Sequence, residues 1–383
     1  MKRSALALVA LGVALLLGSV SAARAAQPVP VRYHAWAPNA TIPAGDTSAT
    51  WTGPVFETGF GFSELVASWN ADTPSGTWIQ VEMRGLTSKS TWTKWYVMGV
   101  WAYGDETIHR TSIGHQGDAD GYVAIDTFFA KDHPLTQYQL RATLSRNAGV
   151  TASPRLRRLG AVASDAPNQK PYIATPFGGT VKTLAVPQYS QEIHAGEYPE
   201  YDGGGEAWCS PTSTSMVLGY WHALPPAKQW SWVDPAYADP WVDDTARQVY
   251  DYHYDGAGNW PFNTAYAGAR GLDAFVTQLR GLDEAEQFIK AGIPLVASVA
   301  ANPNQLSGFL FDKGTNGHLL VIVGFTKNGD VVVNDPASTS DATVQHVYDR
   351  AEFERAWLPA TGGIVYVMHP ASVPLPPATG GNW

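Results

Sequence analysis

A single cysteine, Cys209, is the residue of this 383-residue sequence best suited to covalent chemistry. It follows a glycine-rich stretch, 203–205, and precedes Ser210, Pro211 and an apolar run that ends at Trp221. Proline is favoured in the first turn of a helix, so the pattern predicts a helix that begins beside the sulfur. The free N–H groups and partial positive charge of a helix start favour a thiolate and supply donors for an oxyanion. Cys209 is therefore a candidate nucleophile, although a lone cysteine is also commonly a small buried apolar residue.

A thiol nucleophile needs a base, and the base needs a partner that orients it. Five histidines follow Cys209, and only His318 stands between a loop, 313–317, and a wholly apolar strand, 319–325. Catalytic groups are often presented where a rigid scaffold meets a loop, so His318 is the candidate general base. The same position is also compatible with an ordinary loop histidine that makes one hydrogen bond. Asp335 closes the next apolar strand and is the candidate orienting group.

The geometry expected between His318 and Asp335 depends on the hairpin that joins their strands. Asn328-Gly329 is a strong hairpin signal. A flat hairpin turning there places Asp335 opposite residue 321 or 322, about three residues from His318. Strand twist or a β-bulge must then bring the carboxylate to the imidazole. Other orienting groups within reach of this hairpin are Asn334, Asp330 and Asp341.

In combination, these motifs resemble those of the C39-like cysteine peptidases, a branch of the papain-like superfamily. The resemblance extends over about residues 184–369. It rests on four elements in order, which are Val186-Pro187 with Gln191, Trp208-Cys209-Ser210-Pro211-Thr212-Ser213, Gly317-His318 and Asn334-Asp335-Pro336. The resemblance implies a papain-like α+β fold and a peptidase that cleaves peptide or related amide bonds through an acyl-enzyme.

The resemblance also implies a role for each matching residue. Cys209 is the nucleophile, and His318 is the general base and acid. Asp335 orients the imidazole, and the Gln191 side chain joins the Cys209 backbone N–H in the oxyanion hole. The expected substrate-binding residues, beside the nucleophile and the base, are Trp208 and Gly317. No cofactor is expected, and no cluster with metal-ligand spacing is recognised.

The chain departs from the family pattern at two positions. Ser210 follows the nucleophile, where many members have glycine, and this is compatible with the mechanism because only the backbone N–H is needed there. Gln191 lies 18 residues before Cys209, farther than in papain-like enzymes generally. The intervening segment must therefore loop out, and Gln188 is a competing oxyanion-hole residue. Trp260 is a further aromatic residue that could form a wall of the cleft.

The C-terminal region that carries these residues, 184–370, mixes helices and strands. Helical spacing of apolar residues recurs at 241–252 and 282–289, and apolar strands are predicted at 293–299, 319–325 and 331–335. Helices followed by a sheet favour an α+β domain. The remaining residues, 371–383, form a proline- and glycine-rich tail.

The N-terminal region, 27–163, is predicted to be an all-β domain of unknown role, a sandwich or jelly roll. Short alternating or aromatic runs recur at 62–69, 77–84, 95–103, 122–129 and 137–145, with turn-forming clusters between them. Seven tryptophans lie in this region. Most are expected to fill the core, whereas exposed ones could stack on sugar rings and bind cell-wall carbohydrate. A polar segment rich in proline and glycine, 164–183, is the predicted linker.

The first residues, 1–26, have the layout of a secretory signal peptide. Lys2 and Arg3 precede an apolar run, 5–20, that ends in small residues at 23–26. The apolar core is shorter than the roughly 20 residues that a membrane span needs. The mature protein is therefore expected to be secreted or extracytoplasmic, with no membrane span. Bacteriocin-processing members of the family are fused to membrane transporters, so a free-standing exported hydrolase is favoured here.

Composition narrows the possible partners. A net charge of −9 argues against nucleic acid and anionic membranes. A single cysteine in an exported chain cannot form an intramolecular disulfide, which favours a functional role for the thiol. The leading hypothesis is a secreted cysteine peptidase that acts on a peptide or protein substrate. The alternatives are a catalytically idle exported protein that binds cell-wall glycan and a thiol acyltransferase.

Overall fold

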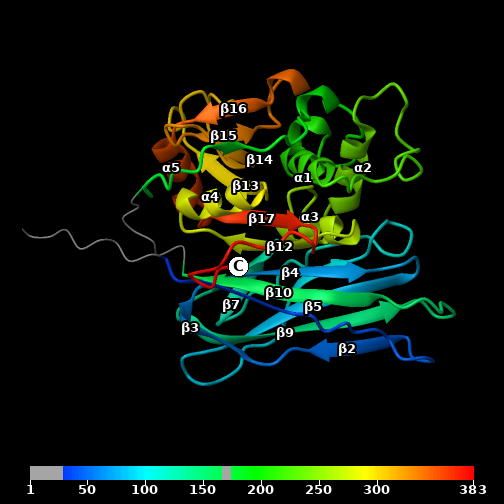
Figure 1. Ribbon diagram of the computed structural model, residues 1–383. Helices are drawn as coiled ribbons and strands as arrows, with labels where there is room; N and C mark the ends of the chain where they lie inside the picture. Colours follow the sequence, from blue (N-terminus) through cyan, green and yellow to red (C-terminus); the bar gives the residue numbers. More distant parts are fainter. Residues whose placement is uncertain (1–28, 166–173) are drawn as a thin grey trace, which may run out of the picture.

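The computed structural model describes residues 29–165 and 174–383. The predicted signal peptide, 1–26, and the centre of the predicted linker, 166–173, lie outside the described residues. The described chain contains three β-sheets and five α-helices. Two sheets come from the N-terminal half, 29–165, and the C-terminal half, 174–383, provides the third sheet and all five helices. Figure 1 shows the two halves stacked, with the helices confined to the upper one.

The N-terminal half is built from two antiparallel sheets of five strands each. The first sheet has the order β1-β10-β4-β8-β7 and consists of β1 (Val31–Trp36), β10 (Arg155–Ser164), β4 (Glu64–Asp72), β8 (Thr127–Ala130) and β7 (Gly121–Ala124). The second has the order β2-β9-β5-β6, with β3 paired to β9, and consists of β2 (Ser48–Thr52), β9 (Leu135–Arg146), β5 (Thr77–Leu86), β6 (Tyr96–Trp101) and β3 (Phe56–Phe62). Alternate residues of β9 are buried from Tyr138 to Leu144, which is the period expected of a strand with one face in the core.

Aromatic side chains join the two N-terminal sheets. The ring centroids of Trp36 on β1 and Tyr138 on β9 lie 6.3 Å apart, and those of Tyr96 on β6 and Phe128 on β8 lie 4.9 Å apart. Among the described tryptophans of this half, none belongs to the exposed class, and Trp69 is fully buried. Trp69 and Trp101 are fully buried and the other five are partly exposed, and the structure gives no support to a sugar-binding platform.

The C-terminal half is organised around one seven-stranded antiparallel sheet. Its order is β12-β17-β13-β14-β15-β16, with β11 paired to β14. The strands are β11 (Lys182–Thr183), β12 (Asp273–Gln278), β13 (Leu295–Ala301), β14 (Thr315–Phe325), β15 (Val331–Asn334), β16 (Gln345–Tyr348) and β17 (Ile364–His369). The helices are α1 (Cys209–Tyr220), α2 (Pro240–Val249), α3 (Trp260–Ala269), α4 (Leu282–Ala291) and α5 (Arg350–Thr361), with short 3₁₀ turns at η2 (Glu192–His194), η3 (Gly205–Ala207) and η4 (Asp341–Thr343).

Local sequence explains several of these boundaries. Asn259 caps α3 by accepting a hydrogen bond from the Phe262 N–H at 3.1 Å, and Pro261 occupies the first turn. Helix α4 ends at Gly292, whose φ of 85° places it in the left-handed region that glycine adopts without strain. The order of elements differs from the prediction of helices followed by a sheet, because β12 lies between α3 and α4.

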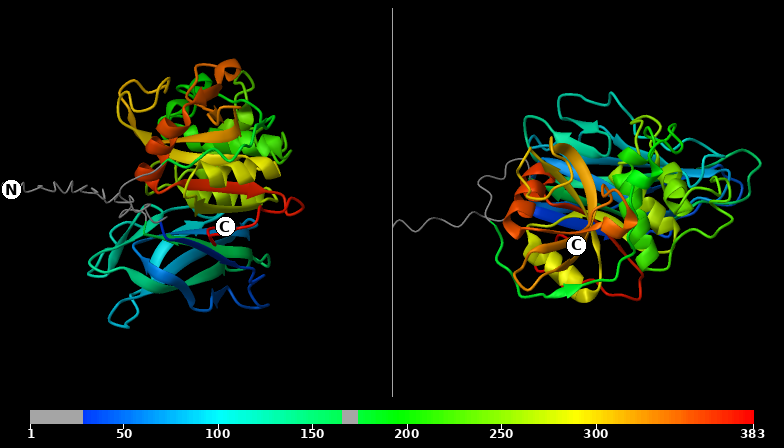
Figure 2. Two further views of the ribbon diagram at one scale, coloured as in Figure 1. Left: turned by 60° about the vertical axis from the view of Figure 1, so that its left-hand side comes forward. Right: turned by 90° about the horizontal axis from the view of Figure 1, so that it is seen from above.

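The two halves share a continuous apolar interface. Strand β4 is buried along almost its whole length, because one of its faces contacts the second N-terminal sheet and the other contacts α3 and β12. The Trp69 and Phe262 ring centroids lie 6.1 Å apart across this interface. Asn70 also exchanges two hydrogen bonds with the backbone of Ala274, at 2.8 and 3.2 Å. The left view of Figure 2 shows the same stacking of the halves from another side.

The predicted tail, 371–383, contains no helix or strand and lies along this junction. The Gly381 carbonyl accepts a hydrogen bond from the Tyr33 N–H at 2.8 Å. Asn382 is fully buried and donates to the Gln278 carbonyl at 2.9 Å. The last residues of the sequence therefore contact both halves.

Candidate active site

Cys209 is the first residue of α1 and is partly exposed. Pro211 stands in the first turn, as the sequence predicts, where its missing N–H leaves no helical hydrogen bond unmade. Helix α1 is almost entirely buried beyond this point. The Ser213 hydroxyl fastens the helix to the central sheet by donating to the Leu319 carbonyl of β14 at 3.1 Å. The thiol is thus held at a fixed helix start next to the strand that carries His318.

His318 and Asp335 are in direct contact. The His318 Nε2 atom lies 2.7 Å from Asp335 Oδ1, and both side chains are buried. The Tyr348 hydroxyl donates to Asp335 Oδ2 at 2.9 Å, and the Ala337 N–H donates to Oδ1 at 3.1 Å. The carboxylate is therefore oriented by three donors when the imidazole is protonated at Nε2.

The β14–β15 hairpin explains how this pair is brought together. Val321 pairs with Asn334, and the register shifts between Ile322 and Gly324. The irregularity moves Asp335 one position nearer to His318 than in a flat hairpin, and this is the type of distortion that the sequence requires. Asp335 itself has left the strand, and its backbone N–H donates to the Val344 carbonyl at 2.8 Å.

The electrostatics of the site favour a protonated imidazole. Burial alone would lower the pKa of His318, but the Asp335 carboxylate and the neighbouring Cys209 side chain together raise it to about 10. Burial would likewise raise the pKa of Asp335, and the His318 charge and the donors around the carboxylate more than offset this and lower it. The arrangement is able to stabilise a thiolate–imidazolium pair.

Gln191 lies in the same cavity and is 1% exposed. Its Nε2 atom donates to the Glu206 carbonyl at 2.6 Å and to Glu192 Oε1 at 3.1 Å. The competing candidate, Gln188, does not line this cavity. The segment between Gln191 and Cys209 loops out through η2 and η3, as the long spacing requires.

The two expected substrate-binding residues differ in position. Gly317 lines the cavity beside His318. Trp208 is fully buried, donates its indole N–H to the Tyr201 carbonyl at 2.6 Å and does not line the cavity. The structure therefore brings Cys209, His318, Asp335, Gln191 and Gly317 together and places Trp208 in the packing behind them.

The cavity around Cys209 has a volume of about 610 Å³ and lies between the two halves. Trp260 forms part of its wall, as the sequence indicates. A second wall comes from the N-terminal half, through residues 124–127 and Phe129 of the β7–β8 hairpin. The sequence pattern predicts one strand over 122–129, but the chain turns back after Ala124 and forms two short strands, so sequence reasoning missed this hairpin. Among the described residues that line the cavity, three are acidic and none is lysine or arginine.

Asp126 fastens the hairpin to the C-terminal half. Its Oδ2 atom accepts a hydrogen bond from the Trp260 N–H, at the start of α3, at 2.8 Å. Burial raises the pKa of Asp126 to about 6, with the nearby Asp251 charge acting in the same direction. The hairpin is thus held against the helix that carries Trp260.

A second cluster of polar side chains lies near the segment that precedes Cys209. His194, Glu197 and Asp243 are all buried, and their potential ligand atoms lie within 4.8 Å of one another. The cluster has no recognisable metal-ligand spacing in the sequence, because Asp243 on α2 is remote in sequence from the other two residues.

Both halves of the chain match models of C39 peptidase domains. Residues 183–365 match the Peptidase_C39 like family, and residues 21–164 match the Peptidase C39 N-terminal domain. The two matches together span most of the sequence. The chain therefore belongs to the C39-like peptidase family.

A search of curated proteins finds no match to this chain. Among solved structures, infectious bursal disease virus Gx strain is 12% identical over 42% of this chain and 38% of that chain, with a TM-score of 0.24. The VP2 subviral particle of the same virus is 11% identical over 40% and 36%, with a TM-score of 0.23. The chain thus spans less than half the length of these structures, and the similarity carries no argument on function. In the described part of the chain, no helix combines the length and apolar character needed to cross a membrane.

Proposed function

We propose that this protein is a secreted cysteine peptidase with a papain-like C-terminal domain that cleaves peptide or related amide bonds. The observation that carries the proposal is the 2.7 Å contact between buried His318 and Asp335, with Cys209 in the same cavity at the start of α1. The family assignment supports a peptidase and a protein or peptide substrate. Secretion rests on the signal-peptide pattern at 1–26.

The proposed reaction begins with attack of the Cys209 thiolate on the carbonyl carbon of the scissile bond. The carbonyl oxygen accepts hydrogen bonds from the Cys209 N–H and the Gln191 amide while it carries negative charge. The His318 imidazolium then donates its proton to the leaving amine as the carbon–nitrogen bond breaks, which leaves a thioester on Cys209. Water, deprotonated by the neutral imidazole, hydrolyses the thioester and regenerates the thiolate–imidazolium pair.

Two further residues support these steps. Asp335 holds the imidazole in one orientation and stabilises its charged form, as in other nucleophile–histidine–carboxylate systems. Gln191 keeps one hydrogen on the Glu206 carbonyl and offers the oxyanion the hydrogen that now points to Glu192. Glu192 must yield this hydrogen bond when substrate enters the cavity.

The test is the rate of Cys209 alkylation by iodoacetamide as a function of pH. In the wild type we expect rapid labelling already at about pH 6, because an imidazolium partner maintains the thiolate. In His318→Ala the labelling rate should be low there and rise with pH as for an ordinary thiol. Equal and slow labelling of both proteins at this pH would overturn the assignment of the pair.

A further inference from the structure

A second pocket adjoins the cavity that contains Cys209. It has a volume of about 280 Å³ and shares four lining residues with that cavity, namely Thr127, Phe129, Trp260 and Thr361. Its far side is formed by Glu64 and Gln278. The pocket thus lies at the junction of β4 in the N-terminal half and β12 in the C-terminal half.

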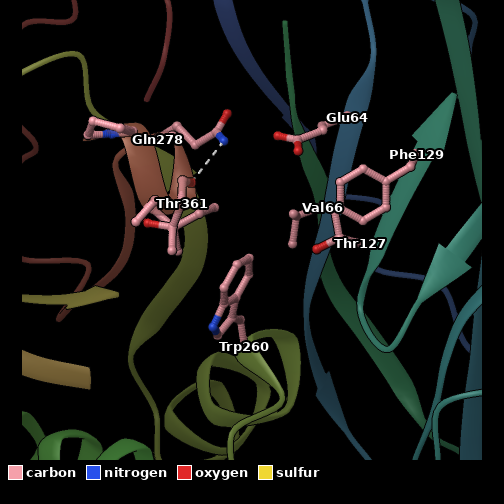
Figure 3. A pocket seen from close by; sticks show the side chains of 11 residues that line it. Glu64, Val66, Thr127, Phe129, Trp260, Gln278 and Thr361 are labelled. Atoms are coloured by element: carbon pink, nitrogen blue, oxygen red, sulfur yellow. Dashed lines mark hydrogen bonds between the residues drawn. The ribbon is translucent and has the colours of Figure 1, made fainter. Parts of the chain in front are cut away.

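Two side chains of this pocket, Glu64 and Gln278, offer hydrogen-bond acceptors, and the Glu64 carboxylate also interacts with the Gln278 and Ser164 side chains. Gln278 is 3% exposed and donates to the Thr361 carbonyl at 3.5 Å, while its Oε1 atom has no hydrogen-bond partner in the described chain. Glu64 forms no ion pair with any described residue. Figure 3 shows the Glu64 carboxylate and the Gln278 amide facing each other across the pocket. A buried acceptor without a donor is unfavourable, so the site favours a ligand that supplies N–H groups.

Two aromatic side chains also line the pocket. Figure 3 shows Phe129 on the side of Glu64 that faces away from Gln278, and Trp260 at the opposite end of the pocket from the two polar side chains. Aromatic faces attract ammonium groups, most strongly where water is excluded. Burial raises the pKa of Glu64 to about 7, with partial compensation by the neighbouring polar side chains, and a bound cation would favour its carboxylate form. None of the described residues that line this pocket is lysine or arginine.

We propose that this pocket is a subsite for a primary ammonium group of the substrate, held between the Glu64 carboxylate and Gln278 Oε1. The proposal rests on the function proposed for Cys209 and gives that function a substrate class, namely peptides that carry a free amine close to the cleaved bond. The amine is that of a lysine-type side chain or of a chain N-terminus, since both offer the same N–H donors. The N-terminal half thereby becomes part of the specificity machinery.

The test compares matched peptides that differ only in the amine. One series contains lysine or norleucine at successive positions, and a second contains a free or acetylated N-terminus. The wild type should cleave the preferred amine-bearing peptide with kcat/KM at least about tenfold above its neutral match, as one buried charge-assisted hydrogen bond provides. The series that shows the preference identifies the source of the amine. Equal cleavage within both series would overturn the subsite.

Two variants complete the test: Glu64→Gln changes the pocket, and Glu57→Gln is the control. Glu64→Gln should abolish the preference by raising KM for the amine-bearing peptide, with little change for the neutral one. Glu57 lies on β3, where its side chain accepts from Gln137 at 2.8 Å, and does not line the pocket, so its variant should behave as the wild type. A preference that persists in Glu64→Gln would also overturn the proposal. Inhibition of the wild type by pentylammonium, compared with pentanol, tests the same site without a substitution.

The subsite can also be tested if the proposed peptidase function is wrong, because binding to the pocket does not require cleavage. If the wild type cleaves no peptide, the peptidase assignment fails while the pocket is still testable by binding. The probe is then N-acetyl-lysine methylamide, titrated into the full chain and followed by NMR, with the norleucine compound as control. Binding of the lysine probe alone, lost in Glu64→Gln, supports the subsite, and no binding of it rejects the subsite.

A second inference rests on a different set of residues, the buried cluster of His194, Glu197 and Asp243. Asp243 is 0% exposed, and its carboxylate interacts only with His194 and Glu197 among the contacts given for the described chain. His194 Nδ1 lies 2.7 Å from Glu197 Oε2 and 3.4 Å from Asp243 Oδ2. Two carboxylates therefore converge on one imidazole nitrogen in a buried site.

Burial of uncompensated charge is strongly unfavourable, and buried carboxylates are therefore paired or coordinate a metal ion. A divalent cation would balance the two carboxylates with a neutral histidine. One imidazole and two carboxylates are ligands typical of zinc in proteins, with water completing the coordination. The cluster connects η2, which directly follows Gln191, with α2.

We infer that His194, Glu197 and Asp243 bind a divalent transition-metal ion, with zinc the expected occupant. The ion would fasten the segment between Gln191 and Cys209 to α2 and would act on structure, since it is not part of the cavity around the thiol. The chemistry proposed for Cys209 does not involve it.

The test uses the purified full chain after treatment with a chelator. Addition of Zn²⁺ should raise the melting temperature, and Co²⁺ should produce visible absorption bands of a tetrahedral or five-coordinate site. Asp243→Asn should lose both effects, while Glu200→Gln, an exposed residue of the same segment, should keep them. The absence of any response of the wild type to Zn²⁺ or Co²⁺ would overturn the inference, whether or not Asp243→Asn folds. A response to Ca²⁺ alone would overturn the choice of metal.

Discussion

Asp126 in the turn between β7 and β8 accepts a hydrogen bond at 2.8 Å from the backbone N–H of Trp260, which follows it by 134 residues in the sequence. This bond joins the N-terminal half to the first turn of α3, and both residues line the cavity that contains Cys209. A contact between the halves thus forms a wall of the candidate active site. The N-terminal half is therefore placed to shape what the thiol can reach.

Replacement of Asp126 tests the importance of this contact. Asp126→Ala should lower the free energy of unfolding by about 1–2 kcal/mol, because the helix start loses its acceptor. It should also raise KM, because the hairpin loses its fixed position beside the cavity. Asp126→Asn retains an acceptor oxygen and should have a smaller effect on both quantities. Urea unfolding and peptide kinetics measure them, and wild-type values for Asp126→Ala would contradict the role of the contact.

Replacement of Cys209 tests the nucleophile. Cys209→Ala should reduce kcat by about 10⁴-fold or more, the scale seen when a covalent nucleophile is removed. The fold should be retained, because alanine removes only one sulfur atom from a partly exposed side chain at the start of α1. Peptide cleavage and thermal unfolding provide the two readouts. Full activity of a folded Cys209→Ala protein would exclude the proposed mechanism.

Replacement of Asp335 tests the origin of the pKa of His318. Burial lowers this pKa, and Asp335 and Cys209 raise it to about 10 from 6.5, so the imidazolium persists up to about pH 10. Asp335→Asn removes the largest of the raising interactions, so the pKa should fall. The high-pH limb of the kcat/KM profile should then move to lower pH, since the charged imidazole is lost earlier.

The same linkage predicts the pH dependence of stability. A raised folded-state pKa contributes stability that is fully present below pH 6.5 and is lost as the pH rises through about 10. In Asp335→Asn this contribution should be smaller and disappear at lower pH. Imidazole NMR titration and unfolding at several pH values test this, with Asp330→Asn on the same hairpin as control. Identical titration of His318 in both variants would contradict the electrostatic role of Asp335.

Replacement of Gln191 distinguishes it from Gln188. Gln191→Ala should lower kcat by about 10²–10³-fold, with little change in KM, because an oxyanion donor acts chiefly in the transition state. The alkylation rate of Cys209 should be affected far less. Gln188→Ala should resemble the wild type, because Gln188 does not line the cavity. The opposite ranking of the two variants would assign the oxyanion hole to Gln188.

Local patterns in the sequence were sufficient to predict individual elements. Pro211 after the lone cysteine predicted the start of α1, and Asn328-Gly329 predicted the β14–β15 hairpin. The apolar run at 319–325 predicted a buried strand, but β14 begins at Thr315, so His318 lies within the strand and not at its mouth as expected. These predictions succeed because capping, turn formation and strand burial depend on residues that are close together in the chain.

Contacts between residues distant in the sequence could not be predicted from local patterns. Trp208 adjoins the nucleophile in sequence, yet its indole packs behind the cavity, because the preceding segment folds back and accepts its N–H. Glu64 and Gln278 are separated by most of the chain and meet in one pocket. Their juxtaposition depends on the docking of β4 against α3 and β12, which no local pattern encodes.

The amino-acid sequence alone is enough to identify the reactive groups, which are one thiol at a helix start, one histidine beside an apolar run and one aspartate after the next strand. The groups that surround them become apparent only in the folded chain. The tertiary structure selected Gln191 over Gln188 as the residue in the cavity and made the β7–β8 hairpin a wall of the cleft. The physical reason is that side-chain type and local conformation are properties of short segments, whereas the shape and charge of a cavity arise from contacts between distant ones.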